Sequence, residues 1–310
     1  MPRYLDTPDQ YIVVNGARLH YLDWGGGGRP LLFLSGIGEP ASVFKWFAPR
    51  FLPRYRPVAL TRRGTGKSQV VPGTYQLPQL VDDVRAVVDA LHLAPVYAVG
   101  HSYGGFEITC LAARFPDRVR GLVYLDALYS QESWALVAED PVPGPQPPAV
   151  PAHALHSFHD YFSYLRASYP FCDKVWSLPI EEAWAVDVEI DQNGQLREID
   201  RGTALSDMMA TAAEQPLDFT ALQCPLLAFA AFEEHHPNTP PGADAELRAK
   251  AEQYHQRRQL AKHATLDALK SQRPGAQVFE IANAPHHLLH THGDLVFSHM
   301  IAFLDSLAEE

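Results

Sequence analysis

The residues whose types and spacing most clearly suggest chemistry are Gly100-His101-Ser102-Tyr103-Gly104. An apolar, β-favouring run at 96–99 leads directly into them, and a helix-compatible segment follows. Gly-x-Ser-x-Gly between a strand and a helix holds its serine on a sharp, strained turn, where small neighbours avoid collisions. The turn exposes the hydroxyl at the head of a helix, whose free N–H groups and dipole favour developing negative charge. We therefore predict that Ser102 is a catalytic nucleophile.

A serine nucleophile needs a base that removes its proton, and His286 is the candidate. It follows a predicted last strand at 278–281, and loops after parallel strands converge at one end of a sheet. The chain has 15 histidines, so one could follow a strand by chance. A serine elbow needs a partner at this edge, however, which favours His286 as the base, with His287 as the alternative.

The segments that must position these residues show the pattern of an α/β protein. Residues 11–14 and 17–22 flank Asn15-Gly16, the strongest short signal for a β-hairpin. From Leu80 onward, apolar residues recur at helical spacing. Short buried strands alternate with such helices, which indicates a mostly parallel sheet covered on both faces. The predicted strands lie at 31–34, 57–60, 96–99, 119–125, 225–230 and 278–281, and further helices at about 243–269 and 295–307.

This alternation breaks after about Leu128 and resumes only after about Asp218. The intervening region contains a proline-rich stretch and aromatic-rich helical pieces. We therefore predict a core formed by residues 1–127 and 219–310. Residues 128–218 would form a helical lid, inserted after strand six and covering a site at the carboxyl ends of the strands.

Bulk composition excludes several classes of protein. The 310 residues are 46% hydrophobic, enough for a large core, and carry a formal net charge of −11. That charge argues against a general nucleic-acid binder. The first ten residues lack the apolar core of a signal peptide, and no apolar run is long enough to cross a bilayer. We expect a cytoplasmic protein without membrane insertion, whose oligomeric state composition leaves open.

With the motifs in order, the chain resembles the α/β-hydrolase superfamily over nearly everything except the lid. The matching features are the elbow, the His286 loop, and two glycine-containing turns, Leu34-Ser35-Gly36-Ile37-Gly38 and Arg63-Gly64-Thr65-Gly66-Lys67-Ser68. Each motif alone is weak, but their order and spacing together are strong. The resemblance implies an eight-stranded, mostly parallel sheet with helices on both faces.

The resemblance also implies catalytic roles. Ser102 would be the nucleophile and His286 the base, and the backbone N–H groups of Ile37 and Tyr103 would form the oxyanion hole. One departure is that Ser35-Gly36 stands where the family usually has His-Gly. The oxyanion hole is formed by main-chain N–H groups and should therefore be retained. The sequence leaves open which contacts support it.

The acid that orients His286 has two candidates. The family's commonest location, after the seventh strand, corresponds to Glu234, and a second location, after the sixth strand, corresponds to Asp126. An ionised aspartate at the end of an apolar strand is expensive unless it is paired, whereas Glu234 lies in a polar loop. We favour Asp126 and keep Glu234 as the alternative.

The predicted substrate contacts are Gly36, Phe158, Tyr161 and Phe162. The aromatic residues fall at helical spacing in the lid, where they either pack it onto the core or line an apolar pocket. We expect neither a metal nor a cofactor, because the histidine clusters lack a carboxylate at a matched helical spacing.

These features predict a serine hydrolase that cleaves small to medium carboxylic esters through an acyl-enzyme. Amide, lactone or carbon–carbon bond hydrolysis uses the same machinery and stays open. A ligand sensor with little turnover is the alternative from another class. A serine nucleophile argues against the epoxide hydrolase and haloalkane dehalogenase branches, which form alkyl-enzyme esters.

Overall fold

The computed structural model describes residues 7–73, 75–142, 150–168, 172–214 and 218–307. Its main sheet has the strand order β1-β2-β4-β3-β5-β6-β9-β10. The pairs β1·β2 and β2·β4 are antiparallel and the other pairs are parallel, so the predicted mostly parallel eight-stranded sheet is confirmed. The strands are β1 (Gln10–Val14), β2 (Ala17–Asp23), β3 (Arg29–Leu34), β4 (Tyr55–Leu60), β5 (Val96–His101), β6 (Val119–Leu125), β9 (Leu226–Phe232) and β10 (Gln277–Ala282).

The predicted hairpin is formed by β1 and β2. Val14 pairs with Ala17, which leaves Asn15 and Gly16 as the two turn residues. Both have positive φ, at 46° and 75°, as a type I′ turn requires. The Asn15-Gly16 pair therefore predicted the position of this turn correctly.

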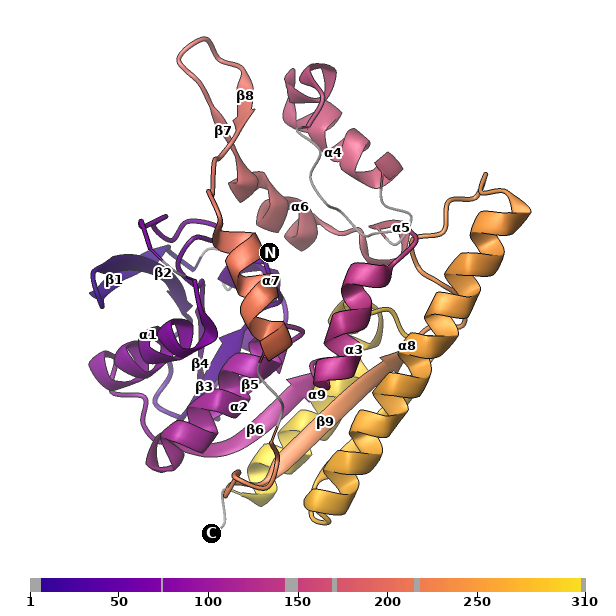
Figure 1. Cartoon of the computed structure of the whole chain (residues 1–310). Coiled ribbons are helices and arrows are strands. Elements are labelled where there is room, and N and C mark those ends of the chain that lie inside the picture. Colours follow the sequence, from indigo (N-terminus) through magenta and orange to yellow (C-terminus); the bar gives the residue numbers. More distant parts are fainter. Residues whose placement is uncertain (1–6, 74, 143–149, 169–171, 215–217, 308–310) are drawn as a thin grey trace.

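The central strands are apolar on both faces because helices cover both sides of the sheet (Figure 1). In β3, Leu32 and Leu34 belong to a cluster shared with α1 (Leu77–Ala90), α2 (Gly104–Arg114) and α8 (Ala245–Gln272). Leu31 and Phe33 belong to the opposite cluster, which contains α9 (Leu289–Ser306) and two short 3₁₀ helices (Ala41–Phe44 and Ala48–Phe51).

Helix α9 begins earlier than predicted. It starts at Leu289 rather than near residue 295, and the backbone is kinked at His292. Its first turn follows the His286 loop directly, so the catalytic candidate is anchored by the helix that packs on the same face of the sheet as the two 3₁₀ helices.

Between β6 and β9 the chain forms an excursion, here called the inserted segment (residues 131–214). Its helices and strands are α3 (Gln131–Ala135), α4 (Phe158–Ser168), α5 (Cys172–Val175), α6 (Leu178–Trp184), β7 (Val188–Ile190), β8 (Leu196–Glu198) and α7 (Ala204–Glu214). In Figure 1, α4, α6 and the β7–β8 hairpin lie beyond the edge toward which the β6 and β9 arrows point. Helices α3 and α7 pack together, with the indole N–H of Trp134 donating to the carbonyl of Met209 at 3.0 Å.

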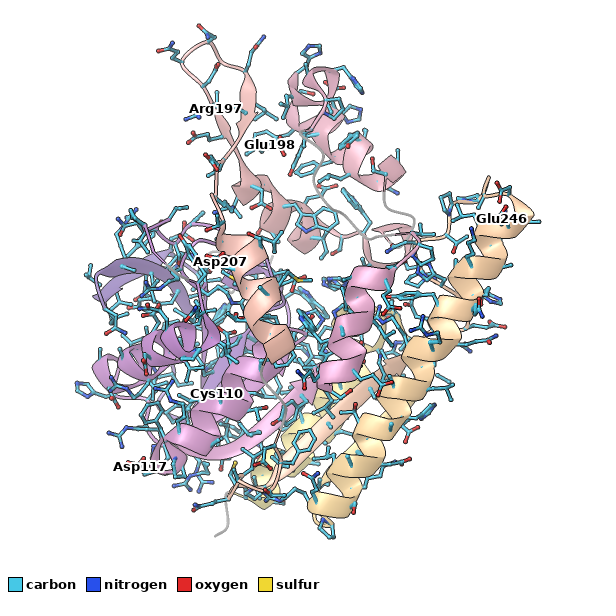
Figure 2. The ribbon with its side chains drawn as sticks, in the orientation of Figure 1. Cys110, Asp117, Arg197, Glu198, Asp207 and Glu246 are labelled. Atoms are coloured by element: carbon cyan, nitrogen blue, oxygen red, sulfur yellow. The ribbon has the colours of Figure 1, made fainter. Side chains whose placement is uncertain are left out.

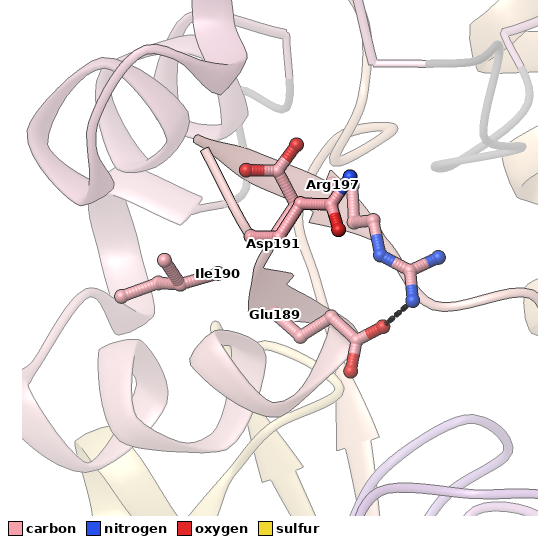
Figure 3. Close-up of a pocket in the computed structure, with 5 residues that line it drawn as sticks. Glu189, Ile190, Asp191 and Arg197 are labelled. Atoms are coloured by element: carbon pink, nitrogen blue, oxygen red, sulfur yellow. Dashed lines mark ion pairs between the residues drawn. The ribbon is translucent and has the colours of Figure 1, made fainter. Parts of the chain in front are cut away.

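The β7–β8 hairpin was not predicted from the sequence. Glu189 and Arg197 lie opposite each other across it and form an ion pair (Figure 3). Arg197 and Glu198 both lie on this hairpin (Figure 2). Arg197 is exposed, whereas Glu198 accepts from the backbone N–H of Val150 at 2.9 Å. A shallow pocket here, lined by Glu189, Ile190, Asp191 and Arg197 among others, includes none of the predicted site residues.

Candidate active site

Ser102 occupies the turn between β5 and α2. Its φ is +51°, a strained value for a residue with a side chain, and the residue is 7% exposed. A Cβ placed on Gly100 would lie 2.5 Å from the carbonyl oxygen of Gly104. One placed on Gly104 would lie 2.4 Å from the carbonyl oxygen of Leu34. Both elbow glycines are therefore needed for close backbone approach.

Asp126 lies directly after β6, beside the elbow. His101 and Leu125 are register partners in β5 and β6, so Ser102 and Asp126 leave neighbouring strands at the same edge. The Asp126 carboxylate accepts from the Ala231 backbone N–H and from Lys262 Nζ, both at 2.8 Å to Oδ1. Its other oxygen, Oδ2, lies 2.7 Å from His286 Nδ1. Burial alone would raise the pKa of Asp126, but Lys262 and His286 outweigh it and hold that pKa far below its usual range.

His286 is oriented by this carboxylate. With Nδ1–H donating to Asp126, Nε2 is left free to accept a proton from a serine. Burial lowers the pKa of His286 to about 4, against the opposing effect of Asp126. This lowered pKa leaves the ring neutral at pH 7. About 34% of the side chain is accessible, so a ligand can reach it.

Tyr129 brings Ser102 and His286 into one neighbourhood. Its hydroxyl interacts with the Ser102 side chain, an interaction that lowers the pKa of the phenol against burial, and its ring centroid lies 6.5 Å from that of His286. Burial outweighs this interaction and raises the pKa of the phenol above its ordinary value, so Tyr129 is neutral at pH 7. Sequence reasoning did not identify Tyr129, although its position three residues after Asp126 was the available signal.

The two alternative residues lie elsewhere. The side chain of Glu234 is 74% exposed and its carboxylate is 3.9 Å from His235. His287 pairs with Glu39, Nε2 to Oε1 at 2.8 Å, whereas His286 pairs with Asp126. The geometry therefore brings His286, rather than His287, to the acid at the end of β6.

The loop after β3 carries the predicted oxyanion donor Ile37. Arg62 donates to the carbonyls of Gly36 and Ser35, at 2.5 and 2.6 Å. The Ser35 hydroxyl donates to the carbonyl of Glu39 at 2.6 Å. These contacts support the loop that carries Ile37.

The other predicted hole donor, Tyr103, precedes α2, and its amide is at the head of that helix. Its ring is fully buried, with the Arg62 guanidinium 5.2 Å from the ring centroid. Arg62 itself forms a buried ion pair with Glu107 of α2, with 2.7 Å between Nη2 and Oε2. One guanidinium thus connects both segments that carry the predicted hole donors.

The predicted aromatic contacts lie in the inserted segment. Tyr161 is buried in a cluster with Leu165 and Val188, and Phe162 packs against the same cluster. Phe158 is 38% exposed. Their assignment to a substrate pocket stays a prediction.

No group of three or more His, Cys, Asp or Glu side chains in the described parts of the chain is arranged to hold a metal ion. Across the same residues, no helix is both long and apolar enough to span a membrane.

Comparison with known proteins supports the fold described above. The family model described as "alpha/beta hydrolase fold" matches residues 29–163. Bifunctional esterase/perhydrolase DCH of Acinetobacter calcoaceticus is 37% identical over 129 residues, 40% of this chain and 44% of that protein. Human epoxide hydrolase 4 is 30% identical over 118 residues, 37% of this chain and 33% of that protein. The match therefore spans less than half the length of these relatives.

Over the whole chain, the similarity is one of structure. The crystal structure of E-2-(acetamidomethylene)succinate hydrolase superposes with a TM-score of 0.72 at 20% identity, covering 96% of this chain and 99% of that one. At that identity the likeness shows the fold alone. Together with the family-model match over residues 29–163, it shows that the chain has the α/β-hydrolase fold.

Proposed function

We propose that this chain is a serine hydrolase that cleaves small to medium carboxylic esters. The observation that carries the proposal is the joint placement of Ser102, His286 and Asp126 at the carboxyl edge of the sheet. The 2.7 Å contact between His286 and Asp126 and the positive φ of Ser102 support it.

In the proposed mechanism, Nε2 of His286 takes the Ser102 proton as Oγ attacks the ester carbonyl. The tetrahedral oxyanion is stabilised by the backbone N–H groups of Ile37 and Tyr103. His286 then protonates the leaving alcohol, and a water molecule hydrolyses the acyl-enzyme with the same groups in reversed roles. Asp126 holds the imidazole tautomer and stabilises the imidazolium that forms.

The choice of ester rests on two supports. One relative is named as an esterase/perhydrolase, and ester hydrolysis needs the least equipment beyond a serine, a base and an oxyanion hole. A second relative is named as an epoxide hydrolase, but Ser102 is not an aspartate and cannot form the alkyl-enzyme ester of that chemistry. We further propose that residues 128–218 act as a lid, since α4 and α6 lie beyond the sheet edge that carries Ser102.

The test is active-site labelling followed by kinetics. A fluorophosphonate probe should modify Ser102, identified by peptide mapping, and steady turnover of a chromogenic short-chain ester should vanish in Ser102→Ala. A panel containing an amide, a lactone and a β-diketone then separates ester hydrolysis from its alternatives. Tight ligand binding without multiple turnover would contradict the hydrolase function and favour a ligand sensor.

A further inference from the structure

A second carboxylate, Glu39, lies buried beside the proposed triad and takes no part in the mechanism above. Its Oε2 accepts from the backbone N–H of Gly36 at 2.8 Å and lies 3.1 Å from Nδ1 of His101. Its Oε1 lies 2.8 Å from Nε2 of His287. The side chain is only 12% exposed, so these contacts satisfy a charge removed from most of the water.

Each of the three partners is adjacent in sequence to a proposed catalytic group. Gly36 precedes Ile37, whose N–H is a proposed oxyanion donor. His101 precedes the nucleophile, and His287 follows the base. One carboxylate therefore ties the oxyanion loop to the elbow and to the His286 loop.

His101 extends this tie to the base itself. Its Nε2 lies 3.2 Å from the carbonyl oxygen of His286, and the two rings are 4.8 Å apart. Both ring nitrogens of His101 thus face acceptors, a carboxylate and a carbonyl, and both contacts are hydrogen bonds only when both nitrogens carry protons. The hydrogen-bond geometry therefore assigns His101 as an imidazolium paired with Glu39.

The surrounding charges agree with this assignment. Burial opposes the charged form of His101, but Glu39 outweighs burial and raises its pKa. Burial would likewise raise the pKa of Glu39, but His101 and His287 hold it well below its usual range. The other ionisable groups that act on this pair are Arg62, Asp126, His286 and His290.

We propose that Glu39, through the His101 imidazolium, is a positioning residue that holds the oxyanion loop in register with the nucleophile and base. The inference rests on the proposed hydrolase function. In this proposal Glu39 does not contact the substrate. Its effect is to fix the Ile37 N–H where negative charge develops, which matters most in the transition state.

The experiment compares Glu39→Gln and Glu39→Ala with a control, Asp83→Asn. Asp83 is also a buried carboxylate, but in the part of the chain that the structure describes its partners are Arg63 and Asn15, which lie outside the oxyanion loop, the elbow and the His286 loop. For each variant one measures kcat and KM on the same ester, the inhibition constant of a boronic acid that forms a tetrahedral adduct with Ser102, and the melting temperature.

We expect Glu39→Gln to lower kcat by roughly 10- to 100-fold, somewhat less than the 10²–10³ for outright loss of a hole donor. KM should change by no more than about threefold, and boronate affinity should fall in parallel with kcat, because both depend on the positioned donor. Glutamine keeps an acceptor for Gly36, so Glu39→Ala should lose more. Asp83→Asn should lower the melting temperature and leave kcat and boronate affinity unchanged.

The proposal is overturned if Glu39→Gln lowers only the melting temperature while kcat and boronate affinity of the folded enzyme stay at wild-type values. If both Glu39 variants fail to fold, His287→Gln is measured instead, because it removes the contact between His287 and Glu39. This variant must then lower kcat and boronate affinity together. A wild-type protein that is not labelled at Ser102 would reject the hydrolase itself. Labelled wild type with unaffected Glu39→Gln would reject only this inference.

Discussion

At the residue scale, the chemistry of His286 is set by two opposing environments. Burial disfavours the imidazolium and Asp126 favours it, and burial prevails, which lowers the pKa of His286 to about 4. A general base must be unprotonated to act, so activity depends on the deprotonated fraction of this ring.

We therefore expect the acid limb of kcat/KM to lie below pH 6.5, toward pH 4. Activity should persist as pH falls from 7 to about 5.5 and decline only as His286 takes up its proton. A pH–rate profile with a stable ester measures this directly. A limb at or above pH 6.5 would mean that the carboxylate, rather than burial, controls the ring.

Two substitutions test whether Asp126 or Glu234 is the acid that orients His286. In Asp126→Asn the His286 tautomer is no longer held, and kcat should fall by about 10⁴, as in the analogous serine protease variant. Glu234→Gln should leave kcat within about twofold, because that side chain is 74% exposed. Comparable losses in both variants would contradict the placement of the acid after β6.

At the element scale, the elbow depends on contact between two backbones. The end of β3 lies so close to the start of α2 that Gly104 has no space for a methyl group: its Cβ would be 2.4 Å from the Leu34 carbonyl oxygen. The same contact brings the oxyanion loop, which follows β3, against the turn that carries Ser102.

Gly104→Ala should therefore force these segments apart, with a cost of about 1–3 kcal/mol in unfolding free energy and a large loss of kcat. Gly27→Ala is the matched control, because a Cβ there meets nothing within 4 Å and its φ is not in the left-handed region. Denaturant unfolding and ester kinetics on both variants give the result. Equal behaviour of the two would show that the elbow tolerates a side chain.

At the scale of the whole molecule, buried histidines couple stability to pH. The pKa values of His286 and His290 are each lowered to about 4, chiefly by burial, and those of His20 and His255 are lowered for the same reason. The unfolded chain binds more protons than the folded one between these pKa values and about 6.5. This contribution to stability is full above pH 6.5 and is lost as pH falls toward 4.

We expect the free energy of unfolding to decline between pH 7 and pH 4.5. His101 opposes the trend, because its raised pKa favours the folded state at low pH, but four lowered histidines outnumber it. Denaturant titrations at pH 7.5, 6.0 and 4.5 provide the measurement. A free energy of unfolding that is constant or increases on acidification would contradict the prediction.

The fold and part of the site could be predicted because their signals are local. The Asn15-Gly16 turn and the Gly-x-Ser-x-Gly elbow are short segments whose backbone requirements can be read from residue types. Asp126 could be favoured over Glu234 because a charge at the end of an apolar strand needs partners.

The contacts that could not be predicted from the sequence join residues that lie far apart in the chain. Lys262 meets Asp126 across 136 residues of sequence, and Glu39 meets His287 across 248. Nothing in a helix of mixed charge marks one lysine as the partner of a buried acid. The β7–β8 hairpin was missed because its strands have three residues each, too few for a recognisable alternation.

The chain leaves and rejoins the sheet through α3 and α7, which are clamped together by the Trp134–Met209 contact. Beyond these two helices the excursion also contacts the core, because Ala183 of α6 belongs to the cluster on the α9 side of the sheet and Lys45 donates to Glu182 at 3.1 Å. A change of substrate preference by replacement of this segment would therefore have to keep both the α3–α7 join and the α6 contacts, while the strand ends that carry Ser102, Asp126 and His286 stay as they are.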